Sequence, residues 1–70
     1  MKWVQTCLNV HRASKIINES IYRCRISDTG VCAILIIEKD DNIIERSEHE
    51  SVNEAKYAAE RYLYNIMHNK

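Results

Sequence analysis

The chain has 70 residues, so we expect a single domain spanning residues 1–70. Hydrophobic residues make up 46% and charged residues 29%, with 10 basic and 10 acidic side chains, a balance that excludes a disordered tail. One glycine and no proline exclude a linker. The longest apolar run, residues 31–37, is far too short to cross a bilayer, so we expect no contact with a membrane.

The N-terminal segment, residues 2–12, fits two kinds of secondary structure. Trp3 and Cys7 follow a helical period, whereas Val4 and Thr6 follow the two-residue period of a strand. No N-cap residue precedes the segment, and β-branched residues are frequent in it. We favour a strand and keep the helix as the alternative.

The middle of the chain is predicted to contain three strands. They cover residues 20–27, 31–38 and 43–47, which either alternate between apolar and polar residues or are rich in aliphatic ones. Asp28-Thr29-Gly30 marks the first turn between them, and residues 39–42 form a polar second turn.

The last element is predicted to be a helix over residues 52–68. Ser51 and Glu54 form the S-x-x-E pattern of a capping box. One apolar stripe then follows at helical spacing, made of Val52, Ala55, Ala58, Ala59, Tyr62, Leu63, Ile66 and Met67. The predicted fold is therefore α+β, a three- or four-stranded antiparallel sheet with one C-terminal helix packed on one face.

The register of the first hairpin decides which side chains face the helix. If Ser27 pairs with Val31, the helix-facing side of the sheet receives Tyr22, Cys24, Ile26, Cys32, Ile34 and Ile36. Ile44 joins them if the second turn spans residues 39–41. The other side then receives Val31, Ala33, Leu35, Ile37 and Ile43. Because antiparallel sheets with one wet face normally alternate, this second apolar side is expected to be covered by a partner.

Residues 22–67 resemble the β-β-β-α part of a double-stranded RNA-binding domain in a degenerate form. The resemblance is carried by the Y-x-C-x-I strand, the turn at residues 28–30 and the helix start S-V-N-E-A-K-Y-A-A. Two lysines that face RNA phosphates in that family are replaced by Val52 and Asn53, so only Lys56 of that binding site carries over. In size and style the chain also resembles small phage and prophage accessory proteins.

Metal binding and catalysis are both disfavoured by the arrangement of the candidate residues. Cys7, His11, Cys24 and Cys32 lack the closely spaced cysteine pair of a structural zinc site, so core packing explains the cysteines better. A nucleophile–base pair of Cys7 or Cys32 with His11 or His49 would need a cleft that one helix on one sheet scarcely provides. We therefore expect no enzyme activity, no metal and no cofactor.

Charged residues are unevenly distributed along the chain. Residues 1–25 hold five basic side chains and one acidic one, namely Lys2, Arg12, Lys15, Arg23 and Arg25 against Glu19. The acidic side chains gather between Asp40 and Glu54, where a solvated loop and a favourable helix N-terminus explain them. Under the alternative function, nucleic-acid binding, the site is expected at Arg23, Arg25 and Lys56.

The favoured function is non-enzymatic binding through a protein partner, as a phage-type accessory or regulatory protein. The predicted contact residues combine the second sheet face with the outer face of the helix: Leu35, Ile37, Ile43, Tyr57, Arg61 and Tyr64. The partner is expected to be a host protein or a second copy in a homodimer, and the alternative function is a nucleic-acid-binding module. An odd number of cysteines and the lack of a signal peptide favour the cytoplasm.

Overall fold

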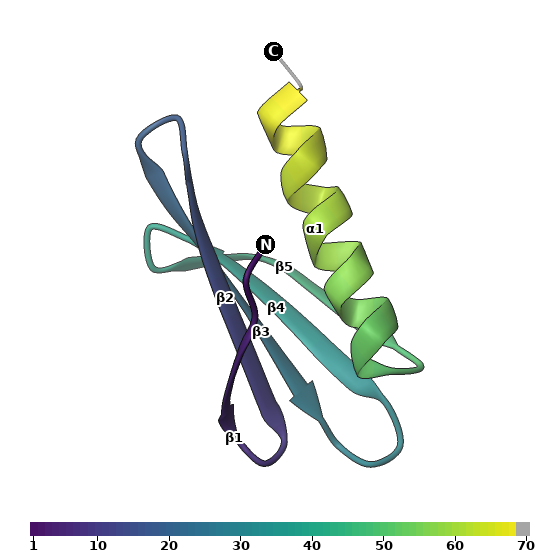
Figure 1. Ribbon diagram of the computed structural model, residues 1–70. Coiled ribbons are helices and arrows are strands. Elements are labelled where there is room, and N and C mark those ends of the chain that lie inside the picture. The colour runs from purple at the N-terminus through teal and green to yellow at the C-terminus, as the bar shows by residue number, and fades with distance from the viewer. Residues whose placement is uncertain (69–70) are drawn as a thin grey trace.

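A computed structural model describes residues 1–68 as a five-stranded antiparallel sheet with one helix on one of its faces (Figure 1). The strands lie side by side in chain order. The elements are β1 (Val4–Cys7), β2 (Val10–Ile17), β3 (Ser20–Asp28), β4 (Ala33–Lys39), β5 (Asn42–His49) and α1 (Val52–His68). The α+β class and the single C-terminal helix are confirmed, whereas the predicted number of strands was too small.

The N-terminal segment contains the strands that the sequence pattern did not separate. β1 and β2 form a hairpin around Leu8 and Asn9, with Cys7 opposite Val10. The strand is thus confirmed over the helical alternative, but it turns back on itself. Neither Leu8 nor Asn9 is followed by the glycine that usually signals a hairpin, so the turn could not be distinguished from a continuous strand.

Two hairpins close through two-residue turns with unusual backbone geometry. Asn18 and Glu19 join β2 to β3 with φ of 50° and 70°, and Asp40 and Asp41 join β4 to β5 with φ of 50° and 71°. Positive φ at both central positions matches the right-handed twist of the flanking strands. The Asp40 carboxylate also accepts a hydrogen bond from the Ile21 backbone N–H at 3.0 Å, which ties this turn to β3.

The register between β3 and β4 differs from the predicted one. Cys24 lies opposite Ile37, where Ile34 was expected, because the connecting loop takes in all four residues from Thr29 to Cys32. The shift amounts to three residues, and any odd shift moves every side chain of a strand to the other face of the sheet.

Leu35 and Ile37 were therefore assigned to the wrong side of the sheet. Their side chains are 1% and 0% exposed and belong to the core cluster under α1. Ile34 and Ile36, which were expected under the helix, are half-buried on the opposite face. Leu35 and Ile37 thus stabilise the fold and are not accessible to a partner.

The C-terminal helix begins and ends where the sequence predicts. The Ser51 hydroxyl accepts a hydrogen bond from the Glu54 backbone N–H at 3.2 Å, which satisfies one of the free donors of the first turn. Ala55 and Ala59 are fully buried, and these small side chains let α1 approach β3, β4 and β5 closely. No helix within residues 1–68 is both long and apolar enough to cross a membrane.

Trp3 links the start of the chain to the middle of α1. It packs against the core, and its indole N–H donates to Glu60 Oε2 at 3.0 Å. Lys56 Nζ lies 6.0 Å from the centre of the indole ring, within reach of a cation–π interaction. The chain before β1 therefore runs back beside α1 (Figure 1).

The observed register predicts opposite stability effects for neighbouring residues of β4. We expect Leu35→Ala to lower the free energy of unfolding by about 2–5 kcal/mol, because it removes most of a fully buried side chain and leaves a cavity in the core. Ile36→Ala, on the half-buried opposite face, is expected to cost about 1 kcal/mol. Urea unfolding followed by circular dichroism measures both, and a larger loss for Ile36→Ala would restore the register first expected.

The β4–β5 turn predicts a contribution to stability that depends on pH. The hydrogen bond from the Ile21 backbone, aided by one from Ser20, holds the pKa of Asp40 below its ordinary value. A lowered pKa in the folded state means that ionised Asp40 stabilises the fold above about pH 4 and that this contribution is lost as the pH falls further. Asp40→Asn should make the free energy of unfolding less dependent on pH below about pH 4. The measurement is the free energy of unfolding at several pH values, and parallel curves for the two proteins would contradict the prediction.

Candidate binding site on the open face of the sheet

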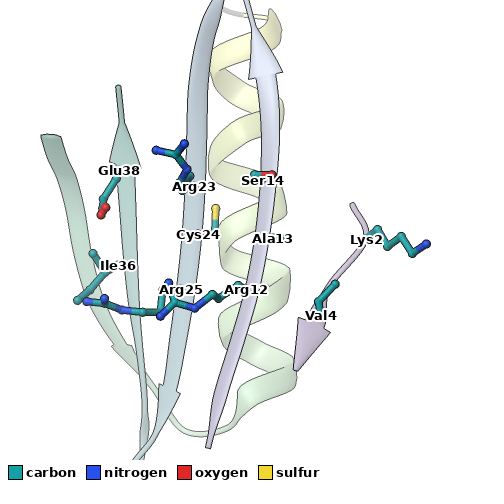
Figure 2. A pocket seen from close by; sticks show the side chains of 10 residues that line it. All are labelled: Lys2, Val4, Arg12, Ala13, Ser14, Arg23, Cys24, Arg25, Ile36 and Glu38. Carbon is teal, nitrogen blue, oxygen red and sulfur yellow. The ribbon is translucent and has the colours of Figure 1, made fainter. Parts of the chain in front are cut away.

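The sheet face that points away from α1 is not covered by any element within residues 1–68, and we name it the open face. Side chains reach it from alternate positions of each strand, as the strand registers require. One row across four strands consists of Arg12, Arg25, Ile36 and Arg46. Figure 2 looks onto this face, with α1 behind the sheet.

Arg12 of β2 and Arg25 of β3 are directly opposite each other on the open face. Together with Lys2 and Arg23 they line a depression of about 520 Å³ (Figure 2). Among residues 1–68, neither Arg12 nor Arg25 has a carboxylate within 4.0 Å, and Arg12 Nε donates only to Thr6 Oγ1 at 3.3 Å. Two guanidinium groups therefore share one area without a neutralising partner.

The other two arginines of the open face have acidic neighbours. Arg23 Nη1 lies 2.7 Å from Asp41 Oδ1, and Arg46 Nη1 lies 3.6 Å from Glu48 Oε2. All four side chains are more than half exposed, so water and salt screen both pairs and each adds little stability. An anionic ligand that replaces these carboxylates would therefore cost the fold little stability.

Charge divides the open face into two halves. The β2–β3 half presents three arginines and no carboxylate from its strands: its residues are Val10, Arg12, Ser14, Ile16, Ile21, Arg23, Arg25 and Ser27. The β4–β5 half mixes Arg46 with Glu38 and Glu48. The positive potential is therefore concentrated over β2 and β3.

The predicted nucleic-acid residues do not form one group. Arg23 and Arg25 lie on the open face, as expected, but Lys56 lies on α1 beside Trp3 in the other layer. Arg12, which was counted only among the basic residues of the N-terminal segment, lies directly opposite Arg25 on the neighbouring strand. It could not be placed from the sequence because β2 itself was not assigned.

The predicted partner residues are also divided between different surfaces. Tyr57 and Arg61 line a groove beside β5 that also includes His49. Tyr64 lies further along α1, where its ring stacks on His68 with centroids 4.2 Å apart. Ile43 is 64% exposed and lies opposite Glu38 on the open face, so the structure does not bring it together with the tyrosines.

The candidate metal and catalytic residues are engaged elsewhere. Within residues 1–68, no three His, Cys, Asp or Glu side chains are placed to share a metal ion. His49 Nε2 is 2.7 Å from the Ser47 hydroxyl, whereas Cys32 Sγ lies near Glu48 and Thr29, at 3.9 and 3.6 Å. Burial raises the pKa of the Cys24 thiol to about 11, so Cys24 stays protonated and packs as a hydrophobic side chain.

Comparisons of this chain with protein-family models, with curated proteins and with solved structures found no match. The arginine pair of the open face is thus the feature from which a function can be inferred.

Two of the free cysteines, Cys7 and Cys24, are expected to react at very different rates with a thiol reagent. Cys7 is exposed, and Cys24 is 1% exposed with a raised pKa. Mass spectrometry after brief labelling at neutral pH should find Cys7 modified and Cys24 unmodified until urea unfolds the chain. Rapid labelling of Cys24 in the folded protein would show that the core opens readily at β3.

Proposed function

We propose that this chain is a non-enzymatic binding protein that binds nucleic acid through the open face, centred on Arg12 and Arg25. The observation that supports this most directly is the pairing of two arginines across neighbouring strands on an uncovered face. Like charges directly opposite each other in a sheet lower its stability. A phosphate between them would remove this repulsion and could accept hydrogen bonds from both guanidinium groups.

We no longer favour the function that the sequence predicted, because two of the three apolar residues behind that expectation, Leu35 and Ile37, are inside the protein. Leu35 and Ile37 pack under α1, and the open face shows arginines between its aliphatic residues. Arginines without carboxylate neighbours suit the phosphates of a polyanion, because each guanidinium group can donate two parallel hydrogen bonds to a phosphate.

A protein partner on the helix side is the second candidate function. Tyr57 is 66% exposed and shares the groove beside β5 with Arg61 and His49. Tyrosine and arginine are enriched among residues that dominate binding energy at interfaces. This groove and the open face belong to different layers, so substitutions can separate the two functions.

Under this proposal the chain acts as a small accessory or regulatory protein. The small size and the free thiols support an accessory protein that acts in the cytoplasm, of the phage type that the chain resembles in style. β3, β4, β5 and α1 follow the order of a degenerate double-stranded RNA-binding domain, while β1 and β2 occupy the segment before it.

The test is a variant in which both Arg12→Gln and Arg25→Gln are made. We expect weaker binding to fluorescein-labelled 20-nucleotide probes, tested both as single strands and as duplexes. The slope of log affinity against log salt concentration should fall by about 2, because each lost phosphate contact removes about one released counterion. The thermal midpoint should stay equal or rise, since the like-charge pair is gone.

Arg61→Gln is the matched control, because it removes one arginine from α1 and leaves the open face intact. Its affinity and salt slope are expected to equal those of the unmodified protein. If the Arg12/Arg25 variant binds as the unmodified protein does, or if neither protein binds any probe, the open face is not a nucleic-acid site. Loss of binding in Arg61→Gln alone would move the site to the groove beside β5.

A further inference from the structure

The aromatic side chains of the chain all lie away from the open face. Tyr22 is 5% exposed in the core under α1, Trp3 packs against that core, and the other three are the helix residues Tyr57, Tyr62 and Tyr64. Proteins that bind single strands stack the unpaired bases on aromatic rings. The open face has no such platform, which favours a duplex whose bases remain stacked on one another.

The β2–β3 half of the open face combines hydrogen-bond donors with exposed aliphatic side chains. Beyond Arg12 and Arg25, the next residues of the face are Ser14 and Arg23, and then Ile16 opposite Ile21. Ile16 is 71% exposed and Ile21 is 38% exposed. A surface that binds this half well should therefore present acceptor atoms and apolar groups within a few ångströms of each other.

The major groove of B-form DNA presents that combination. Its floor carries the N7 and O6 acceptors of the purines together with the methyl group of thymine, and phosphates line both of its edges. Duplex RNA has no thymine methyl, and its deep, narrow major groove does not admit side chains to the bases. The chemistry of the face therefore separates the two kinds of duplex.

The dimensions of the hairpin also fit this groove. β2 and β3 are among the longest strands, and neighbouring strands lie about 4.8 Å apart, whereas the groove is about 12 Å wide. β1 pairs only with residues 10–12 of β2, so the outer edge of β2 is without a strand neighbour from Ala13 onwards. The β2–β3 turn extends beyond β1 and the β4–β5 turn (Figure 1).

We propose that the β2–β3 half of the open face lies in the major groove of B-form duplex DNA. Arg12 and Arg25 contact phosphates, and Ile16 and Ile21 contact thymine methyl groups on the groove floor. Glu38 on β4 marks the boundary of the contact, because a carboxylate facing the duplex would be repelled. This inference rests on the nucleic-acid binding proposed above and specifies which nucleic acid and which of its surfaces are bound.

The experiment compares four 20-base-pair probes of one mixed sequence: duplex DNA, the same duplex with every thymine replaced by uracil, single-stranded DNA and duplex RNA. Fluorescence anisotropy at fixed salt gives each affinity. We expect duplex DNA to bind at least about tenfold more tightly than the single strand or the RNA duplex. Uracil substitution removes methyl groups from the major groove alone and should weaken binding about fourfold for each buried methyl lost.

Two matched variants identify the side chain that contacts the methyl groups. Ile16→Ala should reduce the difference in affinity between the thymine and uracil duplexes, because it removes one of the two isoleucines that contact the methyl groups. Ile43→Ala removes an isoleucine of similar exposure on the β4–β5 half of the same face and should keep the full difference between the two duplexes. Both substitutions are at exposed positions, so the fold is expected to stay intact, which circular dichroism checks.

The outcomes distinguish this inference from the proposed function. Binding of the single strand or the RNA duplex as tight as that of duplex DNA would overturn the inference and leave nucleic-acid binding standing. Equal affinities of the unmodified protein for the thymine and uracil duplexes would overturn the major-groove contact. Binding to none of the four probes would overturn the proposed function itself.

Discussion

The register between β3 and β4 is the constraint on which the two layers of this protein depend. It is set in the loop from Thr29 to Cys32, where the Gly30 N–H donates to Asp28 Oδ1 at 2.9 Å and the Cys32 N–H donates to the Thr29 hydroxyl at 3.1 Å. Gly30 has a φ of 87°, a conformation that residues with a Cβ adopt rarely. A loop shorter or longer by one residue would turn the aliphatic side chains of β4 to the opposite faces.

Because of this register, one face of the sheet forms the hydrophobic core and the other carries the exposed charges. The helix-facing side carries a continuous core with fully buried Ile26, Ile37 and Leu63, while the arginines are all on the open face or on α1. Exposed charges can therefore change without disturbing the core. A 70-residue domain has a small free energy of unfolding, and a binding surface outside the core leaves that free energy largely unchanged.

The sequence predicted the helix and the fold class well because their signals are local. Ser51 and Glu54 mark the start of α1, and an uninterrupted apolar stripe defines its length. The register could not be predicted, since four consecutive aliphatic residues, Ile34 to Ile37, show no alternation, and the Asp28-Thr29-Gly30 signal marks a turn without giving its length.

Arg12 was missed in the candidate site because its place, too, depends on pairing between strands. Arg23 and Arg25 were found because they alternate with apolar residues in a strand that the sequence made clear. The partner of Arg25 is Arg12, and this pairing exists only if the N-terminal segment folds into two strands. A pair formed between strands depends on hydrogen bonds across the sheet, which no pattern within one segment contains.

The hydrogen bond between Trp3 and Glu60 bears on the order of folding because its partners are 57 positions apart. Every strand pair in the sheet joins sequence neighbours through a short hairpin, so the mean contact order of the sheet is low and it can assemble by successive local steps. Closing this long loop costs more conformational entropy than closing any of the short hairpins of the sheet. We therefore expect the indole to dock late in folding and to leave first when the native state begins to open.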